Sequence, residues 1–368
     1  MGLYDLVFKG GGAKGSSFCG AMDAFTAAGH KPRRIIGTSA GAITATLIGA
    51  GYTAQEMLAA CNETLPNGDP VFSTFMDAPQ KSDFTDSDKQ NSQTMQLLQQ
   101  MKIPLVGDYV RKDILNALLD IDLYRELFGF NECGGFYAGN AFLSWFRTKL
   151  QAKRIDPDIT WKDFAAKTGA DVSVVTSDVT EQEMVVLNER TAPACPVAFS
   201  VRMSMSIPFV WREVVWQDTW GTYLGRAKTG HIFVDGGVLS NFALSLVTES
   251  TPDIVAIMGN TDPNGAGTLG LFLDETLPVP GSATAPPTPR PRLKTADRVT
   301  RLVDAMRETS DATVMREYAE YVCHLPTQGY GTTEFRMSKE KMELLIAAGR
   351  DAMNRYLNRM TAVATRSV

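Results

Sequence analysis

Residues 3–51 read LYDLVFKGGGAKGSSFCGAMDAFTAAGHKPRRIIGTSAGAITATLIGAG, and this stretch carries the pattern of the whole fold. Leu3–Phe8 has the composition of a short buried strand and leads into three glycines. A helix is predicted over Ser17–Ala28, where a glycine follows it. Ile35-Ile36 predicts the end of a second strand, which turns through Gly37–Gly41 into another apolar helix. This repeated order of strand, glycine turn and helix is typical of an α/β fold with a mainly parallel sheet.

The composition is that of a chain with a substantial core. Its 368 residues allow one large domain or two modest ones, and 44% of them are hydrophobic. The net charge of −5 gives no reason to expect nucleic acid as a partner. Five cysteines without a C-x-x-C pair fit a reducing compartment better than a disulfide framework.

Histidine is scarce, which limits the chemistry that the chain can perform. Only His30, His231 and His324 are present, so ligands for zinc and candidates for an imidazole base are few. We therefore expect no metal and no cofactor, and hydrolytic chemistry that makes little use of imidazole.

The amino terminus shows neither the basic nor the apolar segment of a signal peptide. The longest apolar stretch, 40–51, is too short to span a bilayer. We expect a cytoplasmic chain that contacts membranes as a peripheral protein. Secretion without a signal leaves no trace in a sequence and stays open.

The middle of the chain predicts an insertion upon the α/β core. Composition changes to Asp, Ser, Asn, Pro and Thr after Pro66, and helical spacing returns over Asp108–Leu127. We place a helical insertion or lid at 66–135, and expect a further helix over Asn140–Ala152. Beyond it, β-rich segments predict more strands, at Val172–Val175, Met184–Leu187, Val214–Trp216, His231–Val234 and Asp253–Met258.

Prolines cluster near the end of the chain and suggest a boundary. Residues 275–292 are proline-rich and predict an exposed loop or linker. Helices are expected over Thr295–Cys323 and Ser338–Met360, with Tyr330–Met337 as a candidate strand between them. The predicted organisation is a catalytic domain over 1–260, the linker at 275–292, and a helical extension over 293–368 packed on the core.

Gly37-Thr38-Ser39-Ala40-Gly41 is the strongest indication of chemistry. A nucleophilic serine must stand on a tight strand-to-helix turn, and glycines two residues before and after it leave room for that backbone. The helix that follows directs its positive end and its unpaired N–H groups toward an oxygen that becomes charged. The competing interpretation is a helix start built from small residues.

Two further motifs join this turn. Gly10–Gly15 fits neither a dinucleotide loop, which needs an acidic residue about 20 positions later, nor a P-loop. Its glycines suit a loop whose backbone N–H groups face an oxyanion. Asp235-Gly236-Gly237 ends a predicted strand, and Asp235 can act as a base to a serine without a histidine. An ordinary Asp-Gly turn is the alternative.

In this order the three motifs resemble the patatin-like phospholipases, whose patterns are G-G-G-x-[RK]-G, G-x-S-x-G and D-G-[GA]. Phe199–Trp211 is similar to the segment that the family writes as A-x-R-A-S-x-x-I-P, and Thr176–Thr180 to its T-D-x-x-T strand end. Two positions depart from the family pattern. Lys9 stands where the family often has Asp, and Asn241 lacks the proline that often follows two residues later.

The resemblance implies a three-layer α/β/α fold with a central, mainly parallel sheet, a helical insertion and a helical C-terminal tail. It also implies a Ser–Asp dyad, with Ser39 as nucleophile and Asp235 as general base, acting on fatty-acyl esters of membrane phospholipids as a phospholipase of the A type. The resemblance assigns the oxyanion hole to Gly10, Gly11, Gly12 and Ala13. The residues that it assigns to the support of these motifs are Lys14, Gly15, Gly37, Gly41, Gly236 and Gly237.

Several alternatives stay open. The same dyad can serve an acyltransferase, a lysophospholipase or a neutral-lipid esterase, and a catalytically silent protein would only bind lipid. A triad of Ser39, Asp235 and His324 is formally available. Lys14 can support the loop, meet a lipid phosphate or be an ordinary surface lysine. Such phospholipases commonly wait for an activator, so an unidentified activator or a homo-oligomer is a further expected partner.

Overall fold

The computed structural model describes residues 2–100, 108–260, 265–282 and 317–366. These residues form an eight-stranded central sheet in the order β12-β11-β1-β2-β4-β10-β7, with β5 also paired to β4. The pairs from β12 to β4 are parallel, and β10, β7 and β5 run antiparallel to their neighbours. The predicted α/β class with a mainly parallel sheet is confirmed. The strands of the sheet are β1 Leu3–Phe8, β2 Lys31–Thr38, β4 Asp171–Asp178, β5 Glu183–Leu187, β7 Val214–Val215, β10 Ile232–Asp235, β11 Gly267–Pro278 and β12 Val322–Gln328.

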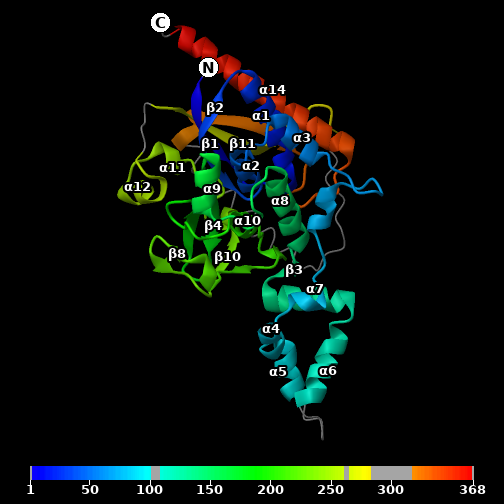
Figure 1. Ribbon diagram of the computed structural model, residues 1–368. Coiled ribbons are helices and arrows are strands. Elements are labelled where there is room, and N and C mark those ends of the chain that lie inside the picture. The colour runs from blue at the N-terminus through cyan, green and yellow to red at the C-terminus, as the bar shows by residue number, and fades with distance from the viewer. Residues whose placement is uncertain (1, 101–107, 261–264, 283–316, 367–368) are drawn as a thin grey trace.

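Helices cover both faces of the sheet, because its central strands are apolar on both sides (Figure 1). In β1, Leu6 and Phe8 join the larger core, whereas Val7 between them joins the smaller core on the opposite face. Ile35 and Ile36 of β2 divide in the same way. The larger core takes residues from α1 Ser16–Ala27, α2 Ala40–Gly49, α3 Ala54–Cys61, α8 Asn140–Ala152, α9 Trp161–Thr168, α10 Val197–Ser204 and α14 Lys339–Arg366, and the smaller one from α11 Ser245–Thr248 and α12 Pro252–Met258.

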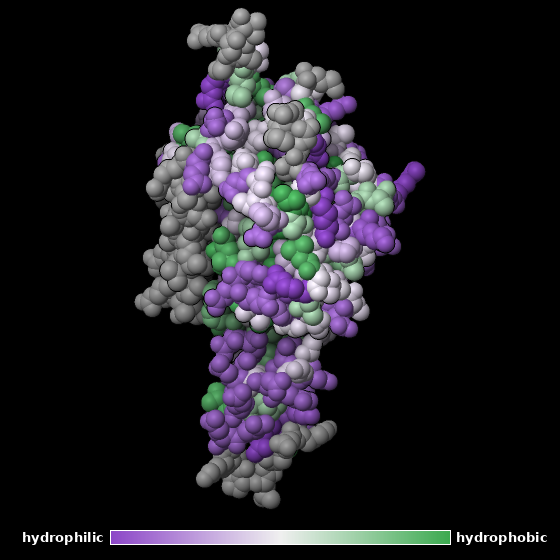
Figure 2. All heavy atoms as spheres, turned by 90° about the vertical axis from the view of Figure 1, so that its left-hand side faces the viewer, coloured by the Kyte–Doolittle hydropathy of each residue, from purple (hydrophilic) through white to green (hydrophobic). Residues whose placement is uncertain are grey.

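The insertion forms a helical stalk that projects away from the sheet (Figure 1). Its small core contains five buried side chains, Phe84, Met95, Leu115, Leu119 and Phe128. The face shown in Figure 2 is mostly hydrophilic along this stalk. The helical run expected over 108–127 is divided into two helices. The elements of the insertion are η2 Val71–Phe75, η3 Lys81–Asp83, α4 Asp86–Gln90, α5 Gln93–Gln100, α6 Asp108–Leu118 and α7 Asp122–Cys133, and short strand pairs lie nearby as β3 Gly135–Tyr137 with β6 Phe209–Trp211, and β8 Thr222–Tyr223 with β9 Arg226–Ala227.

The sheet continues beyond residue 260, where we expected the catalytic domain to end. β11 pairs with β1, and β12 pairs with β11 at the edge. Glu275–Pro278, expected as a loop, form the end of β11, and Cys323, expected in a helix, lies in β12. The rest of the expected linker and helix, 283–316, lies outside the described residues. Residues 330–337, our candidate strand, form turns.

Asp253–Met258 was expected to be a strand and is helix α12 instead. Short apolar runs do not distinguish the two, and the local signals here favour a helix. Thr251 caps the helix by accepting the N–H of Ile254, and Pro252 occupies the first turn, where its missing donor costs nothing.

The C-terminal helix α14 packs along α1 through glycines. A Cβ at Gly20 would lie 1.9 Å from the carbonyl oxygen of Ile346, and one at Gly349 would lie 2.2 Å from that of Ser17. The two helices therefore approach more closely than larger side chains allow. None of the described helices is long and apolar enough to cross a membrane.

Candidate active site

Ser39 stands on the turn between β2 and α2, as the sequence predicts. Its backbone has φ 55° and ψ −119°, a combination that residues with side chains rarely adopt and that costs about 1–3 kcal/mol. A Cβ at Gly37 would lie 2.1 Å from the carbonyl oxygen of Gly41, and one at Gly41 would lie 2.3 Å from that of Phe8. The two glycines are therefore required for the turn to fit against β1.

Asp235 ends β10 and is fully buried. It lies opposite Thr176 of β4, while Thr38, the residue before Ser39, lies opposite Val175 on the other side of the same strand. Two strand spacings place the backbones of the two residues about 10 Å apart. The Asp235 carboxylate accepts the N–H of Gly237 at 2.7 Å. Among the described residues, no hydrogen bond joins Ser39 Oγ to Asp235.

The glycine loop meets the serine turn at Gly10, close to Asn241, which follows the aspartate motif. A Cβ added there would lie 2.3 Å from Asn241 Oδ1 and 3.2 Å from Ser39 Cβ. The turn after Asp235 also contacts the serine turn, since a Cβ at Gly236 would lie 3.0 Å from Thr38 Cγ2. Motifs separated by up to about 200 residues in the sequence are thus packed against one another.

Some backbone N–H groups of the glycine loop are hydrogen-bonded within the fold and others are not. The Gly10 N–H donates to the carbonyl of Asn241 at 3.0 Å, and the Ala13 N–H donates to that of Thr332 at 2.9 Å. Within the described part of the chain, the N–H groups of Gly11 and Gly12 have no protein acceptor. Of the four residues expected at an oxyanion hole, Gly10 and Ala13 thus use their N–H groups in the fold, and the assignment of Gly11 and Gly12 stays a prediction.

Lys14 is buried and forms an ion pair with Glu275 of β11. Its interpretation as an ordinary surface lysine is wrong, and the contact holds the loop against the sheet. Lys9, which replaces the aspartate common at this position, is also buried. Its ammonium donates to the carbonyl of Leu273 at 3.1 Å and lies 3.8 Å from the centre of the Phe272 ring.

Ser39 opens into a cavity of about 730 Å³, a volume that includes the open space at its mouth. Most of the wall is apolar and aromatic, with Ile43, Leu47, Phe72, Phe75, Trp145, Met205, Trp211 and Phe335 among its residues. Met205 lines the cavity, whereas Met203, two residues earlier, is fully buried in the core.

Two cysteine thiols complete the wall. Cys19 and Cys61 are free, and their Sγ atoms lie 3.1 Å apart. The hydrogen bond between them and their burial raise the pKa of Cys19 well above its ordinary value. A neutral thiol keeps this side of the cavity apolar. The cavity is therefore shaped for a hydrophobic group next to a serine hydroxyl.

Comparison with known sequences matches the profile described as Patatin-like phospholipase over residues 6–247. The chain belongs to the patatin-like phospholipase family. Membership supports lipid hydrolase activity in general, and the match ends before β11.

Similar proteins were found among both curated sequences and solved structures. The protein YqhO of Bacillus subtilis (strain 168), described as uncharacterized, is 26% identical over 368 residues and covers 97% of this chain and 99% of its own. The probable lipid hydrolase 463L of Invertebrate iridescent virus 6 is 20% identical over 241 residues, which are 66% of this chain and 62% of the viral protein. VipD from Legionella pneumophila has a similar fold, with a TM-score of 0.50 and 17% identity over 97% of this chain and 67% of VipD.

Two site residues lie beyond the family match and were not predicted. Thr332 accepts the Ala13 N–H, and a Cβ at Gly12 would lie 2.1 Å from its carbonyl oxygen. Phe335 lines the cavity and packs edge-on against Trp211, with ring centres 5.5 Å apart. No local motif marks either residue, because both reach the site through the tertiary path of β12 and the turn after it.

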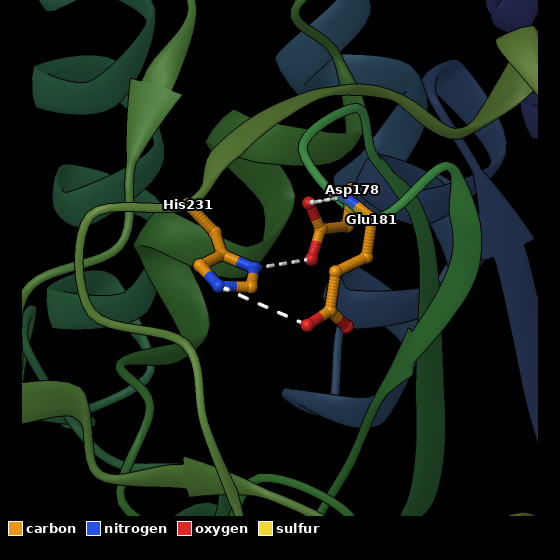
Figure 3. Close-up of side chains that lie close together, drawn as sticks. All are labelled: Asp178, Glu181 and His231. Carbon is orange, nitrogen blue, oxygen red and sulfur yellow. Dashed lines mark hydrogen bonds and ion pairs between the residues drawn. The ribbon is translucent and has the colours of Figure 1, made fainter.

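A second polar cluster lies at the end of β4. Asp178, Glu181 and His231 direct their ligand atoms toward one another, all within 4.8 Å (Figure 3). However, Lys228 is fully buried beside them, with its Nζ 2.8 Å from Asp178 Oδ2 and in contact with Glu181 and Glu183. Because this ammonium already pairs with the carboxylates of the cluster, we interpret the cluster as a partly buried ion-pair network and not as a cation site.

Two of the three histidines each pair with an aspartate. His231 Nδ1 lies 2.8 Å from Asp178 Oδ2, and His324 Nδ1 lies 2.7 Å from Asp274 Oδ2. Among the described residues, neither imidazole contacts Ser39 or Asp235. The geometry gives no support to a triad that includes His324.

Proposed function

We propose that the chain is a lipid acyl hydrolase of the phospholipase A type, with Ser39 as the nucleophile and Asp235 as the general base. The observation that carries this proposal is the packing of the serine turn against both other motifs: Gly10 of the glycine loop lies against Ser39, and Gly236, next to Asp235, lies against Thr38. Family membership and the apolar cavity beside Ser39 support the same conclusion.

The proposed reaction proceeds in two halves. Ser39 Oγ attacks the carbonyl carbon of the ester while Asp235 takes the hydroxyl proton. The N–H groups of Gly11 and Gly12 bind the oxyanion, and the proton passes to the departing alcohol. Water then attacks the acyl-enzyme with Asp235 as base, which releases the fatty acid and restores the hydroxyl. Ester and water are consumed, and alcohol and acid are produced.

The serine and the aspartate reach hydrogen-bonding distance on binding of substrate in this scheme. Catalytic hydrogen bonds are often long before substrate is bound, so the absence of a direct bond is compatible with the mechanism. The insertion remains our candidate for a lid or a surface for an activator. Contact with a membrane surface as a peripheral protein is part of the same proposal, because phospholipid substrate resides there.

The experiment is lipid mass spectrometry after incubation with vesicles of mixed phospholipids. The wild type is compared with Ser39→Ala, and Ser200→Ala controls for removal of a buried serine hydroxyl elsewhere. Fatty-acid release by the wild type and Ser200→Ala, absent from Ser39→Ala, is the expected result. Labelled acyl chains that appear on added lysolipid in place of free acid would establish an acyltransferase. Equal release by all three proteins would overturn the role of Ser39.

A further inference from the structure

The end of helix α10 contacts both residues of the proposed dyad. Ser204 is fully buried, and its Oγ accepts the backbone N–H of Ser39 at 2.8 Å. The same hydroxyl donates to the carbonyl of Val175 on β4 at 2.6 Å. One hydroxyl therefore joins the strained serine turn to the neighbouring strand of the sheet.

The second contact lies two residues later. The carbonyl of Ser206 accepts the backbone N–H of Asp235 at 2.8 Å. Met205, between the two contacts, lines the cavity. Residues 204–206 thus fix the main chain of Ser39 and that of Asp235 relative to one another, and they form part of the cavity wall.

A buried arginine holds this segment in place. Arg202 donates to the carbonyls of Ala138 and Arg212 at 2.8 and 3.0 Å, and also to Ser206 Oγ. Gly139 leaves room for the guanidinium, since a Cβ there would lie 2.4 Å from Arg202 Nε. The end of α10 is therefore attached by side-chain and backbone contacts to the segment before α8 and to the strand connection after β6.

We propose that Ser204 is a positioning residue for the reaction, whose hydroxyl holds Ser39 in its strained conformation at a fixed spacing from Asp235. This inference rests on the proposed function. The backbone angles of Ser39 set the direction of its Oγ. The hydrogen bond from the Ser39 N–H to Ser204 Oγ holds the backbone of that residue in place. Loss of the bond allows the turn to relax, and displacement of a reacting atom by about 1 Å can cost 100-fold in rate.

Ser204→Ala tests the inference against Ser200→Ala as a matched control. Ser200 is one turn earlier on the same helix and equally buried. Its Oγ also joins separate groups, accepting from Trp161 Nε1 at 2.8 Å, donating to the carbonyl of Pro196 at 3.0 Å, and lying 3.3 Å from Cys195 Sγ. Both variants lose a buried hydroxyl and should lower the melting temperature similarly. Only Ser204→Ala should lower kcat, by about 10- to 100-fold with KM within about twofold.

Ser204→Cys provides a graded second variant, because a thiol is a weaker donor and acceptor of similar shape. Its kcat should fall between those of the wild type and Ser204→Ala, and it carries the test if Ser204→Ala does not fold. Equal kcat for the Ser204 variants and Ser200→Ala, or a change confined to KM, would overturn the inference. A wild type without Ser39-dependent activity would instead refute the proposed function, so the two failures are distinguishable.

Discussion

Two fully buried aspartates on adjacent strands have different surroundings. Asp178 ends β4, and Asp235 ends β10, which runs antiparallel beside it. Asp178 lies opposite Phe233 and Asp235 lies opposite Thr176, so both aspartates face the same side of the sheet. Their residue type, burial and strand position are alike, and their neighbours decide what each can do.

The Asp178 carboxylate is saturated by fixed partners. Oδ2 accepts from Lys228 Nζ and His231 Nδ1, both at 2.8 Å, and Oδ1 accepts from the N–H groups of Thr180 and Glu181 at 2.9 and 3.2 Å. The turn that follows Asp235 instead packs against the turn of the strained serine, through the contact of Gly236 with Thr38. We infer that Asp178 serves the stability of the fold, and Asp235 the proposed chemistry.

The largest expected effect is on activity, at the Ser39 site. Ser39→Ala should lower kcat/KM for phospholipid by at least about 10³-fold, and Asp235→Asn by about 10²–10⁴-fold, because one removes the nucleophile and the other the base. Both variants should keep a cooperative urea transition. Asp178→Asn is the matched control and should retain activity within about tenfold. If Asp178→Asn lowered kcat as much as Asp235→Asn does, the proposed distinction between the two aspartates would be wrong.

The largest expected effect on stability is at Lys228. Lys228→Met removes the ammonium and leaves the buried Asp178 charge without it, which should cost about 3–5 kcal/mol of unfolding free energy in urea. Adding Asp178→Asn to this variant should restore part of the loss, since the buried charge is then removed. A loss below about 1 kcal/mol in the single variant would show that the network is not a structural ion pair.

A smaller effect should appear in the pH dependence of stability. Burial opposes ionisation of Asp178, but hydrogen bonds from Lys228 and His231 outweigh it and lower the pKa of the carboxyl group. Its stabilising contribution is therefore complete above the pKa of about 4 in the unfolded chain, and is lost as the pH falls through the lower folded value. Melting temperatures from pH 7 to pH 3 should fall less steeply for Asp178→Asn than for the wild type. If the melting temperatures of the two proteins fell equally with pH, the stabilising role of the ionised Asp178 carboxylate would be contradicted.

The smallest effects are expected at the histidines. His231→Ala and His324→Ala should each change esterase kcat by less than about fivefold, because the imidazoles pair with Asp178 and Asp274. Burial of Asp274 opposes ionisation, yet hydrogen bonds from His324 and Thr276 lower its pKa to about 2, as expected for a structural pair. A loss of 100-fold or more at either histidine would refute the dyad.

The first 50 residues could be interpreted from the sequence because their signals are local. The buried strand Leu3–Phe8, the glycines around Ser39 and the apolar helix after it each constrain the backbone within a few residues. Family membership then followed from motifs that are widely spaced in the chain. The prediction from the residues alone gave the correct class of sheet but missed the strands β11 and β12 at one edge.

The remainder depends on contacts that no local pattern encodes. The first two residues of β12, Val322 and Cys323, were expected at the end of a helix, and the pairing of β12 with β11 decides otherwise. Thr332 and Phe335 reach the site from a turn about 320 residues after the glycine loop, and Lys228 meets Asp178 across 50 residues. Ser204 lies within the segment 199–211 that resembles the family pattern, but the contact of its hydroxyl with Ser39 follows only from the structure.

Covalent labelling of Ser39 tests the central claim most directly. The wild type, Ser39→Ala and Ser200→Ala are treated with a fluorophosphonate probe, and the adduct is located by peptide mass spectrometry. The account predicts one adduct, on the peptide that contains Ser39, in the wild type and in Ser200→Ala, and none in Ser39→Ala. Labelling of Ser39→Ala to the same extent, or an adduct on a different serine of the wild type, would contradict it.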